Sequence, residues 1–116
     1  MRVLIVSGDR TLQTTLKRLL RRHGDVVGQA PSWREAPPLF QARAPALVIL
    51  DTRSGAAGMS ACRQFRSVPG HGRFLLLAVT APRPARSHLK VLAAGADDVL
   101  PWPAPAAMVE ARLGIA

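Results

Sequence analysis

Residues Ala46–Asp51 read ALVILD, a run of five apolar residues that stops at one carboxylate. A short, unbroken apolar run rich in Val, Ile and Leu is typical of a strand that is buried on both faces of a parallel sheet. In open sheets of this kind, ligands and chemistry lie beyond the carboxyl ends of the strands. Asp51 therefore marks the edge where a functional site is expected, although it could equally cap a helix or open a turn.

The composition fits one soluble domain with a single core. The chain has 116 residues, of which 48% are hydrophobic and 20% are charged, and this is enough apolar material for one core. No apolar run approaches the roughly 18 residues that a membrane span needs. Residues 1–9 read as a strand and turn rather than a secretory signal. The single cysteine, Cys62, is interpreted as a small core residue, and its isolation agrees with a reducing, cytoplasmic location.

The charge is strongly basic, with a net charge of +9 and arginine at 14 of the 16 basic positions. Such a surface can attract nucleic acid or an acidic partner. The main basic cluster, at positions 17–23, falls at the end of a predicted helix, where a solvated face that complements the helix dipole is the favoured interpretation. Trp33 and Trp102 lie far apart and there is no Tyr, so base stacking and nucleic-acid binding are not expected.

Strand and helix signals alternate along the whole chain, without an internal repeat or a linker. Five segments read as strands: Arg2–Val6, Val26–Ala30, Ala46–Asp51, Phe74–Thr80 and Asp98–Pro101. This alternation predicts an α/β fold in which a parallel sheet with right-handed crossovers carries helices on both faces. The first helix is expected to be capped by Asp9 or Thr11 and to end at Gly24.

The remaining helical segments carry weaker signals. Residues 32–35 form a capping-box pattern, but Pro37 and Pro38 predict that the helix that follows is short, shifted or kinked. Residues 54–58 are expected to form a flexible loop, and residues 69–72 a turn. The apolar residues expected on the inner faces of the later helices are Met59, Cys62 and Phe65, then Leu89, Leu92 and Ala93, and finally Met108, Val109 and Leu113.

Several of these positions together resemble the receiver domain of bacterial two-component response regulators. Asp51 ends the third strand, Thr80 ends the fourth, residues 94–98 (AGADD) lead into the fifth, and Pro103 follows it. The resemblance extends over residues 2–113. It implies one receiver domain with the flavodoxin-like (βα)5 three-layer fold and strand order 2-1-3-4-5. It also implies a signalling domain rather than an enzyme.

The resemblance implies phosphoryl transfer onto Asp51 from a histidine kinase. In the family, an acidic pair after the first strand helps to hold Mg²⁺, and a hydroxyl at the position of Thr80 binds the phosphoryl group. A Lys before the last Pro contacts the same group. Each part supplies positive charge or hydrogen bonds to the negative oxygens that gather around the attacking carboxylate.

The chain departs from this pattern at the charged positions. The acidic pair falls on Ser7 and Gly8, the Lys falls on Trp102, and the switch aromatic of the fifth strand falls on Val99. Asp9 follows the missing pair by one residue, and it is interpreted as a helix cap rather than a metal ligand. No cofactor is therefore expected, Mg²⁺ binding is disfavoured, and conventional phosphorylation is expected to be impaired.

Two questions about the site stay open in the sequence. Arg10, Arg53 or Arg83, each expected near the carboxyl edge of the sheet, could supply positive charge, although exposed loop arginines are the favoured interpretation. Trp102 is expected to pack over the sheet edge and fill the pocket of Asp51. An exposed interaction anchor is the less favoured interpretation of this tryptophan.

Three functions follow from these observations. The first is a receiver phosphorylated on Asp51, with a histidine kinase or another signalling protein as its partner. The second is a phosphorylation-independent interaction or dimerisation module, in which the resemblance implies a homodimer formed through the last two helices. The third and least favoured is a basic nucleic-acid-binding domain. The chain stops soon after Leu113, which suggests an output domain outside it.

Overall fold

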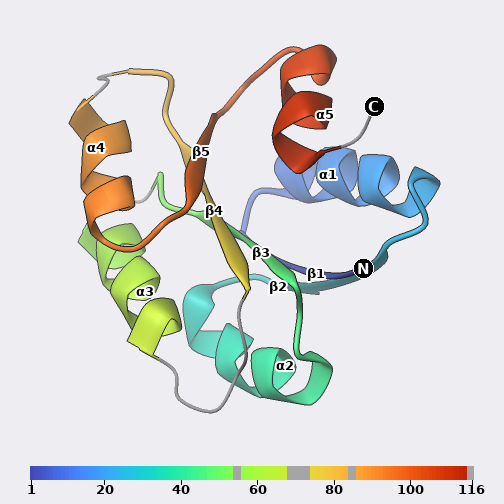
Figure 1. Ribbon diagram of the computed structural model, residues 1–116, viewed down its shortest axis with the longest axis horizontal. Helices are drawn as coiled ribbons and strands as arrows, with labels where there is room; N and C mark the ends of the chain where they lie inside the picture. The colour runs from blue at the N-terminus through green and yellow to red at the C-terminus, as the bar shows by residue number, and fades with distance from the viewer. Residues whose placement is uncertain (54–55, 68–73, 84–85, 115–116) are drawn as a thin grey trace.

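The computed structural model contains the alternation of strands and helices that the sequence predicts (Figure 1). It describes residues 1–53, 56–67, 74–83 and 86–114. In chain order the elements are β1 (Arg2–Val6), α1 (Arg10–Arg22), β2 (Val26–Ala30), the 3₁₀ turn η1 (Trp33–Glu35), α2 (Ala36–Arg43), β3 (Leu47–Asp51), α3 (Ala56–Ser67), β4 (Leu75–Thr80), α4 (Arg86–Ala93), β5 (Asp98–Pro101) and α5 (Ala106–Leu113). None of the helices in these ranges is long and apolar enough to cross a membrane.

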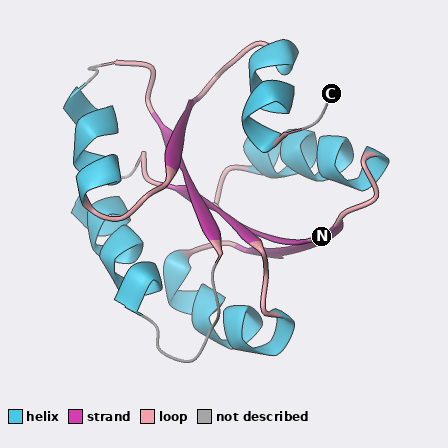
Figure 2. Ribbon diagram, viewed as in Figure 1, coloured by secondary structure: helices cyan, strands magenta, loops and turns pink. Residues whose placement is uncertain are grey.

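The five strands pair in parallel in the order β2-β1-β3-β4-β5. Helices α1 and α5 cover one face of this sheet, and α2, α3 and α4 cover the other (Figure 2). This confirms the flavodoxin-like three-layer fold. Because the strands are parallel, the carboxyl ends of β1, β3 and β4 meet at one edge of the sheet.

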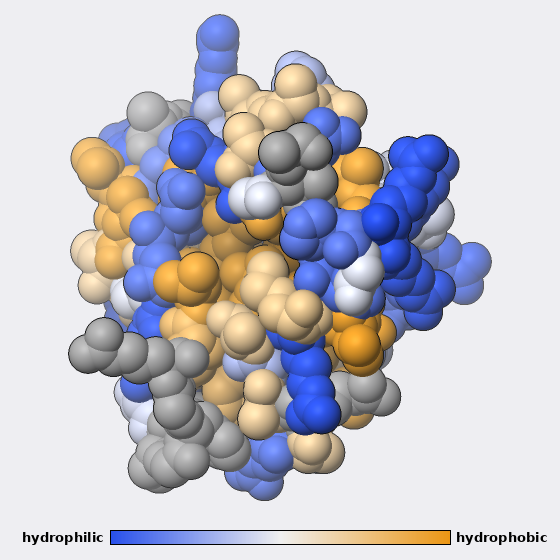
Figure 3. Space-filling view, turned by 45° about the vertical axis from the view of Figure 1, so that its right-hand side comes forward, coloured by the Kyte–Doolittle hydropathy of each residue, from blue (hydrophilic) through white to orange (hydrophobic). Residues whose placement is uncertain are grey.

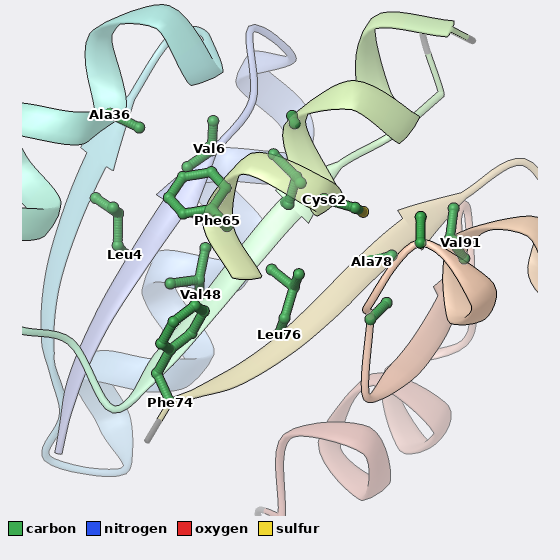
Figure 4. Packing of buried hydrophobic residues seen from close by; sticks show 14 of the residues in the cluster. Leu4, Val6, Ala36, Val48, Cys62, Phe65, Phe74, Leu76, Ala78 and Val91 are labelled. Atoms are coloured by element: carbon green, nitrogen blue, oxygen red, sulfur yellow. The ribbon is translucent and has the colours of Figure 1, made fainter. Parts of the chain in front are cut away.

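A separate hydrophobic core fills each side of the sheet, because successive strand residues point to opposite faces. In β3, Val48 and Leu50 belong to the core under α2, α3 and α4, whereas Leu47 and Ile49 belong to the core under α1 and α5. Figure 4 shows the first core, with side chains from the sheet and from α3 meeting under the helices. Within this core, the Phe40 ring lies edge-on to the rings of Phe65 and Phe74, at centroid distances of 5.6 and 4.9 Å.

The region before α2 differs from the predicted capping box. Ser32 precedes only the single 3₁₀ turn η1, and its side chain makes no capping hydrogen bond. The helix α2 begins instead at Ala36 and is short, as expected. Pro37 and Pro38 therefore lie in its first turn, where a missing backbone N–H removes no intrahelical hydrogen bond.

The predicted loop before α3 is partly wrong, because α3 begins at Ala56 and residues 56–58 are helical. Gly58 allows this helix to lie directly against β3. A Cβ atom at Gly58 would lie 2.6 Å from the Cα of Thr52, much closer than side-chain atoms approach a backbone. Residues 54–55 and the predicted turn at 69–72 lie outside the described residues.

The inner face of α4 was also predicted wrongly. Leu89 and Leu92 are 68% and 40% exposed, Ala93 is exposed too, and the buried residue of this helix is Val91. The helix has only about two turns, and it is oriented by its contact with the sheet rather than by its largest side chains. In α5 the predicted Val109 and Leu113 are buried, whereas Met108 is 41% exposed.

Candidate functional site

Asp51 is the last residue of β3, and its side chain is only 14% exposed at the carboxyl edge of the sheet. Ser7, directly after β1, donates a hydrogen bond from Oγ to Asp51 Oδ2 at 2.7 Å. Arg53 donates from Nε to Oδ1 at 2.9 Å and from Nη2 to Oδ2 at 2.7 Å. Its backbone N–H also donates to Oδ1 at 3.1 Å. Both oxygens of the Asp51 carboxylate are therefore bound within the protein, in the two-pronged geometry that makes Arg–carboxylate pairs strong.

Arg53 also joins Asp51 to the start of α1. Its Nη2 donates to Asp9 Oδ2 at 2.8 Å, so one guanidinium bridges two carboxylates. The other oxygen of Asp9 accepts hydrogen bonds from the backbone N–H groups of Thr11 and Leu12 at 2.9 and 3.1 Å. The predicted helix cap is thus confirmed. The bridge to Arg53 is a second role for Asp9 that the sequence did not indicate.

The interpretation of Arg53 as an exposed loop arginine is wrong, since its side chain is 26% exposed and lies against Asp51. Arg10 and Arg83, the two other candidates, are exposed. Among the residues that the structure describes, the hydrogen bonds to the Asp51 carboxylate come from Ser7 and Arg53. The only signal in the sequence was the position of Arg53 two residues after the strand-end acid, which lets its side chain fold back.

These contacts keep all three charged groups ionised. Burial acts to raise the pKa of the Asp51 carboxyl, but hydrogen bonds from Arg53 and Ser7 outweigh it, and the pKa lies below its ordinary value. The hydrogen bond from Arg53 lowers the pKa of Asp9 as well. The pKa of Arg53 is raised, chiefly by its hydrogen bond to Asp51. The site therefore holds two carboxylates and one guanidinium at neutral pH.

Thr80 ends β4 and is 2% exposed. Its Oγ1 has no hydrogen-bond partner among the described residues. Thr80 lines a cavity of about 110 Å³ together with Arg53 and Ser87. The neighbouring hydroxyl, that of Thr52, is already used, because it donates to the carbonyl oxygen of Val79 at 2.8 Å. Buried hydroxyl groups normally have a partner, so Thr80 stands out among the described residues as a buried hydroxyl without one.

A second and larger hollow of about 520 Å³ lies over Asp51 itself. Its wall includes Ser7, Gly8, Asp9 and Trp33. Arg53 lines this hollow and the cavity of Thr80. Arg53 therefore separates two hollows at the end of the sheet, one lined by Asp51 and the other by Thr80.

Trp102 packs in the interior, but not where it was expected. It is 9% exposed and belongs to the core under α1 and α5 with Leu100 and Val109. In the described part of the chain it lines neither hollow at the site. Residues two apart in an extended chain share a face, so Trp102 follows Leu100. Val99 points to the opposite core and is also buried.

The oxygen donors at this edge differ from those that Mg²⁺ usually takes. Mg²⁺ needs near-octahedral oxygen coordination and is commonly bound by one or two free carboxylates. Ser7 and Gly8 supply no carboxylate, and Asp9 and Asp51 share the guanidinium of Arg53. Within the described ranges, no group of three or more His, Cys, Asp or Glu side chains could hold a metal ion.

Known proteins place the whole chain in one family. The sequence profile of the response regulator receiver domain matches residues 3–113. The chain is similar to the response regulator MprA of Mycolicibacterium vanbaalenii, with 36% identity over 103 residues, which cover 88% of this chain and 44% of that protein. For MprA of Mycobacterium avium the identity is 34% over 104 residues, covering 89% and 45%. The chain thus spans less than half the length of these curated relatives.

Solved structures agree with the sequence comparison. The BeF3-activated N-terminal receiver domain of Klebsiella pneumoniae RstA superposes with a TM-score of 0.84 at 27% identity, covering 98% of this chain and 96% of that chain. A response regulator from Thermotoga maritima has the same fold, with a TM-score of 0.87 at 20% identity over 97% and 93% of the two chains. Receiver domains are signalling modules of two-component systems and not enzymes. The chain belongs to the response regulator receiver domain family.

Proposed function

We propose that this receiver domain signals with its phosphoacceptor position held by an internal cation, and that Mg²⁺-dependent phosphorylation of Asp51 is consequently impaired. The bidentate contact of Arg53 with Asp51 carries this proposal. A carboxylate can attack phosphorus only with an oxygen that is free to approach it. Here Oδ1 accepts from Arg53, and Oδ2 accepts from both Arg53 and Ser7.

The charge balance also opposes phosphoryl transfer. The reaction gathers negative oxygens around the acceptor and depends on fixed positive charge for its stabilisation. One guanidinium faces the carboxylates of Asp9 and Asp51, so the three side chains are net negative before a donor arrives. Without the acidic pair that Ser7 and Gly8 replace, the site lacks the ligands that would bring a divalent cation.

The partner proposed for this domain is a histidine kinase or another protein of a two-component pathway. Receiver domains pair with histidine kinases, and the relatives of this chain are about twice as long as the part that it matches. We propose that signals pass to an output domain outside the present sequence. With Trp102 and Val99 both buried in the two cores, the link from Asp51 to the surface differs from the Lys and aromatic pair expected in the family.

A second candidate function is an interaction module that needs no phosphate. The exposed apolar side chains of the last two helices favour it: Leu89 and Leu92 on α4, and Met108 on α5. These helices flank β5 (Figure 1). Light scattering tests the homodimer, which should weaken when Leu89→Ser and Leu92→Ser are combined. A monomer at all concentrations would rule out the homodimer.

The test of the main proposal is labelling with acetyl phosphate and Mg²⁺, followed by intact mass. The native chain should remain largely unlabelled. Ser7→Asp and Gly8→Asp, combined with Arg53→Met, should restore the acidic pair, free the Asp51 carboxylate and give added phosphate. Adding Asp51→Asn to that variant should abolish the label. Rapid, stoichiometric labelling of the native chain that disappears in Asp51→Asn alone would contradict the proposal.

A further inference from the structure

A basic hollow of about 510 Å³ lies between α1 and the edge strand β2, away from the Asp51 site. Four cations of α1 and two amide side chains line it: Lys17, Arg18, Arg21, Arg22, Gln13 and Gln29. Hydrophilic side chains gather along the right-hand side of Figure 3, the side that the turn from Figure 1 brings forward. This is the side of the molecule on which α1 lies in Figure 1.

The structure of α1 explains only part of this cluster. Leu12, Leu16 and Leu20 are buried against the sheet, so the cations take the outer side of the helix. Arg21 and Arg22 lie in the last turn, where positive charge complements the helix dipole. Lys17 and Arg18 lie a turn earlier, and each has a second cation four residues on, an arrangement that destabilises a helix. The fold alone does not account for these two charges.

The acidic residues of the chain do not neutralise the hollow. None of the ion pairs between described residues involves its four cations. The acids in those pairs have other partners: Asp9 and Asp51 with Arg53, Asp25 with His23 and the Met1 ammonium, Asp97 with Arg66, and Asp98 with Arg112. The positive charge of the hollow is thus not balanced by an ion pair between described residues.

The hollow adjoins a strand edge that is open to pairing. Among the described strands, β2 is the outermost and pairs with β1 alone. The backbone of Val26 donates to Met1 O, and that of Ser7 donates to Ala30 O, so the even-numbered residues of β2 face β1. By alternation, the backbone N–H and C=O groups of Val27 and Gln29 point to the open edge. Such an edge is a template for an additional extended segment.

We propose that an extended, acidic segment of a partner protein binds along β2 and places its carboxylates in the basic hollow. The arginines of the hollow support an acidic partner, because a guanidinium binds a carboxylate in a two-pronged geometry. The edge of β2 would bind the backbone of the segment, and Lys17, Arg18, Arg21 and Arg22 would select its charge. None of the four cations belongs to the group of side chains that binds Asp51.

The same observations disfavour other occupants. A second copy would bring a net charge of +9 and the same basic surface to the contact. Single-stranded nucleic acid is bound largely by stacking on aromatic side chains, but Trp102 is buried and Trp33 packs against the core on the opposite face of the sheet. An anionic membrane is bound best where apolar side chains flank the cations, whereas the residues that line the hollow are all polar or charged.

The test uses a fluorescent peptide of alternating Glu and Thr, with Gln in place of Glu in the control peptide. The native chain should bind the acidic peptide and not the control. Arg18→Glu with Arg21→Glu should weaken binding roughly tenfold or more. The matched variant, Arg63→Glu with Arg86→Glu, changes two exposed arginines of α3 and α4 and the net charge equally. It should keep most of the affinity.

Two further measurements make the test decisive. Thermal melting of both double variants shows that lost binding is not lost folding. Amide hydrogen exchange should slow at Val27 and Gln29 when the acidic peptide is bound, because their N–H groups would enter a strand pair. Equal weakening in both variants would show attraction by net charge alone and overturn the proposal. Tighter binding of duplex DNA or anionic vesicles, lost in the Arg18 and Arg21 variant, would also overturn it.

Discussion

Arg53 and Arg18 have the same side chain in opposite surroundings. Arg53 is 26% exposed and bridges two carboxylates at the carboxyl edge of the sheet. Arg18 is exposed on α1 beside other cations, and no ion pair between described residues involves it. Each of these two arginines contributes one positive charge to the net charge of +9. The difference teaches that the first arginine belongs to the internal structure of the site, whereas the second is available to a partner.

The largest expected difference between the two regions is in stability. Arg53→Met should lower the free energy of unfolding by about 2 kcal/mol, because it leaves the half-buried carboxylates of Asp9 and Asp51 without their cation. Urea unfolding at neutral pH measures this change. The control is Arg83→Met, an exposed arginine near the same edge, for which the change should stay within about 0.5 kcal/mol. Equal effects of the two substitutions would mean that the Arg53 bridge is not stabilising.

The pH dependence of stability should also distinguish Arg53→Met from the native chain. The folded-state pKa values of Asp51 and Asp9 lie below their ordinary values. Their contribution to stability is therefore present above the unfolded pKa of about 3.9 and is lost as the pH falls through the folded pKa. In Arg53→Met the largest of the causes that lower the pKa of Asp51 is lost, while its burial and its hydrogen bonds from Ser7 and the backbone of residue 53 remain, so its pKa should rise toward its ordinary value.

The free energy of unfolding should therefore depend differently on pH in the two proteins, in the range where carboxylates titrate. The native chain should lose stability on acidification through this range. Arg53→Met should lose less, because the pKa values of Asp51 and Asp9 in its folded state then lie closer to their unfolded values. Unfolding free energies measured at several acidic pH values test this, and parallel curves for the two proteins would contradict it.

At the basic hollow, removing positive charge should have the opposite effect on stability. Arg18→Glu replaces like-charge repulsion with attraction to Arg21 and Arg22 along the helix, and should raise the free energy of unfolding by about 0.3–0.5 kcal/mol. Arg18→Gln, which removes the cation without adding an anion, should give a smaller gain. Loss of stability in both variants would show that Arg18 has a structural partner.

Salt should have the smallest effect and should act mainly on α1. Raising NaCl to about 0.5 M screens charges on the surface more than partly buried pairs. The native chain should therefore gain a few tenths of a kcal/mol, about as much as from one exposed charge pair, and Arg18→Glu should gain less. A larger salt response in Arg53→Met than in Arg18→Glu would reverse the contrast between the two regions.

The central strands β1, β3 and β4 could be predicted almost to the residue, because strands buried on both faces appear as continuous apolar runs. β3 was expected at Ala46–Asp51 and spans Leu47–Asp51. The face of α4 could not be predicted in this way. In so short a helix, the leucines at 89 and 92 form as good an apolar stripe as the buried Val91. Only the contact with the sheet decides between them.

The placement of Asp51 and Thr80 at the ends of their strands could be predicted from the sequence, but the charge network around Asp51 could not. Asp51 and Thr80 follow apolar runs, and parallel pairing brings such residues to one edge. Asp9 was recognised as a cap from its position before α1. The bridge by Arg53 depends on the path of the chain after β3. Three arginines were expected near that edge, and the one signal for the arginine that folds back was the position of Arg53 two residues after Asp51.

The Thr80 hydroxyl has a consequence for any molecule that reaches it, because it makes no hydrogen bond to another described residue. Its position is fixed by β4, of which Thr80 is the last residue. A visiting oxygen atom would meet a preorganised contact with no internal bond to break.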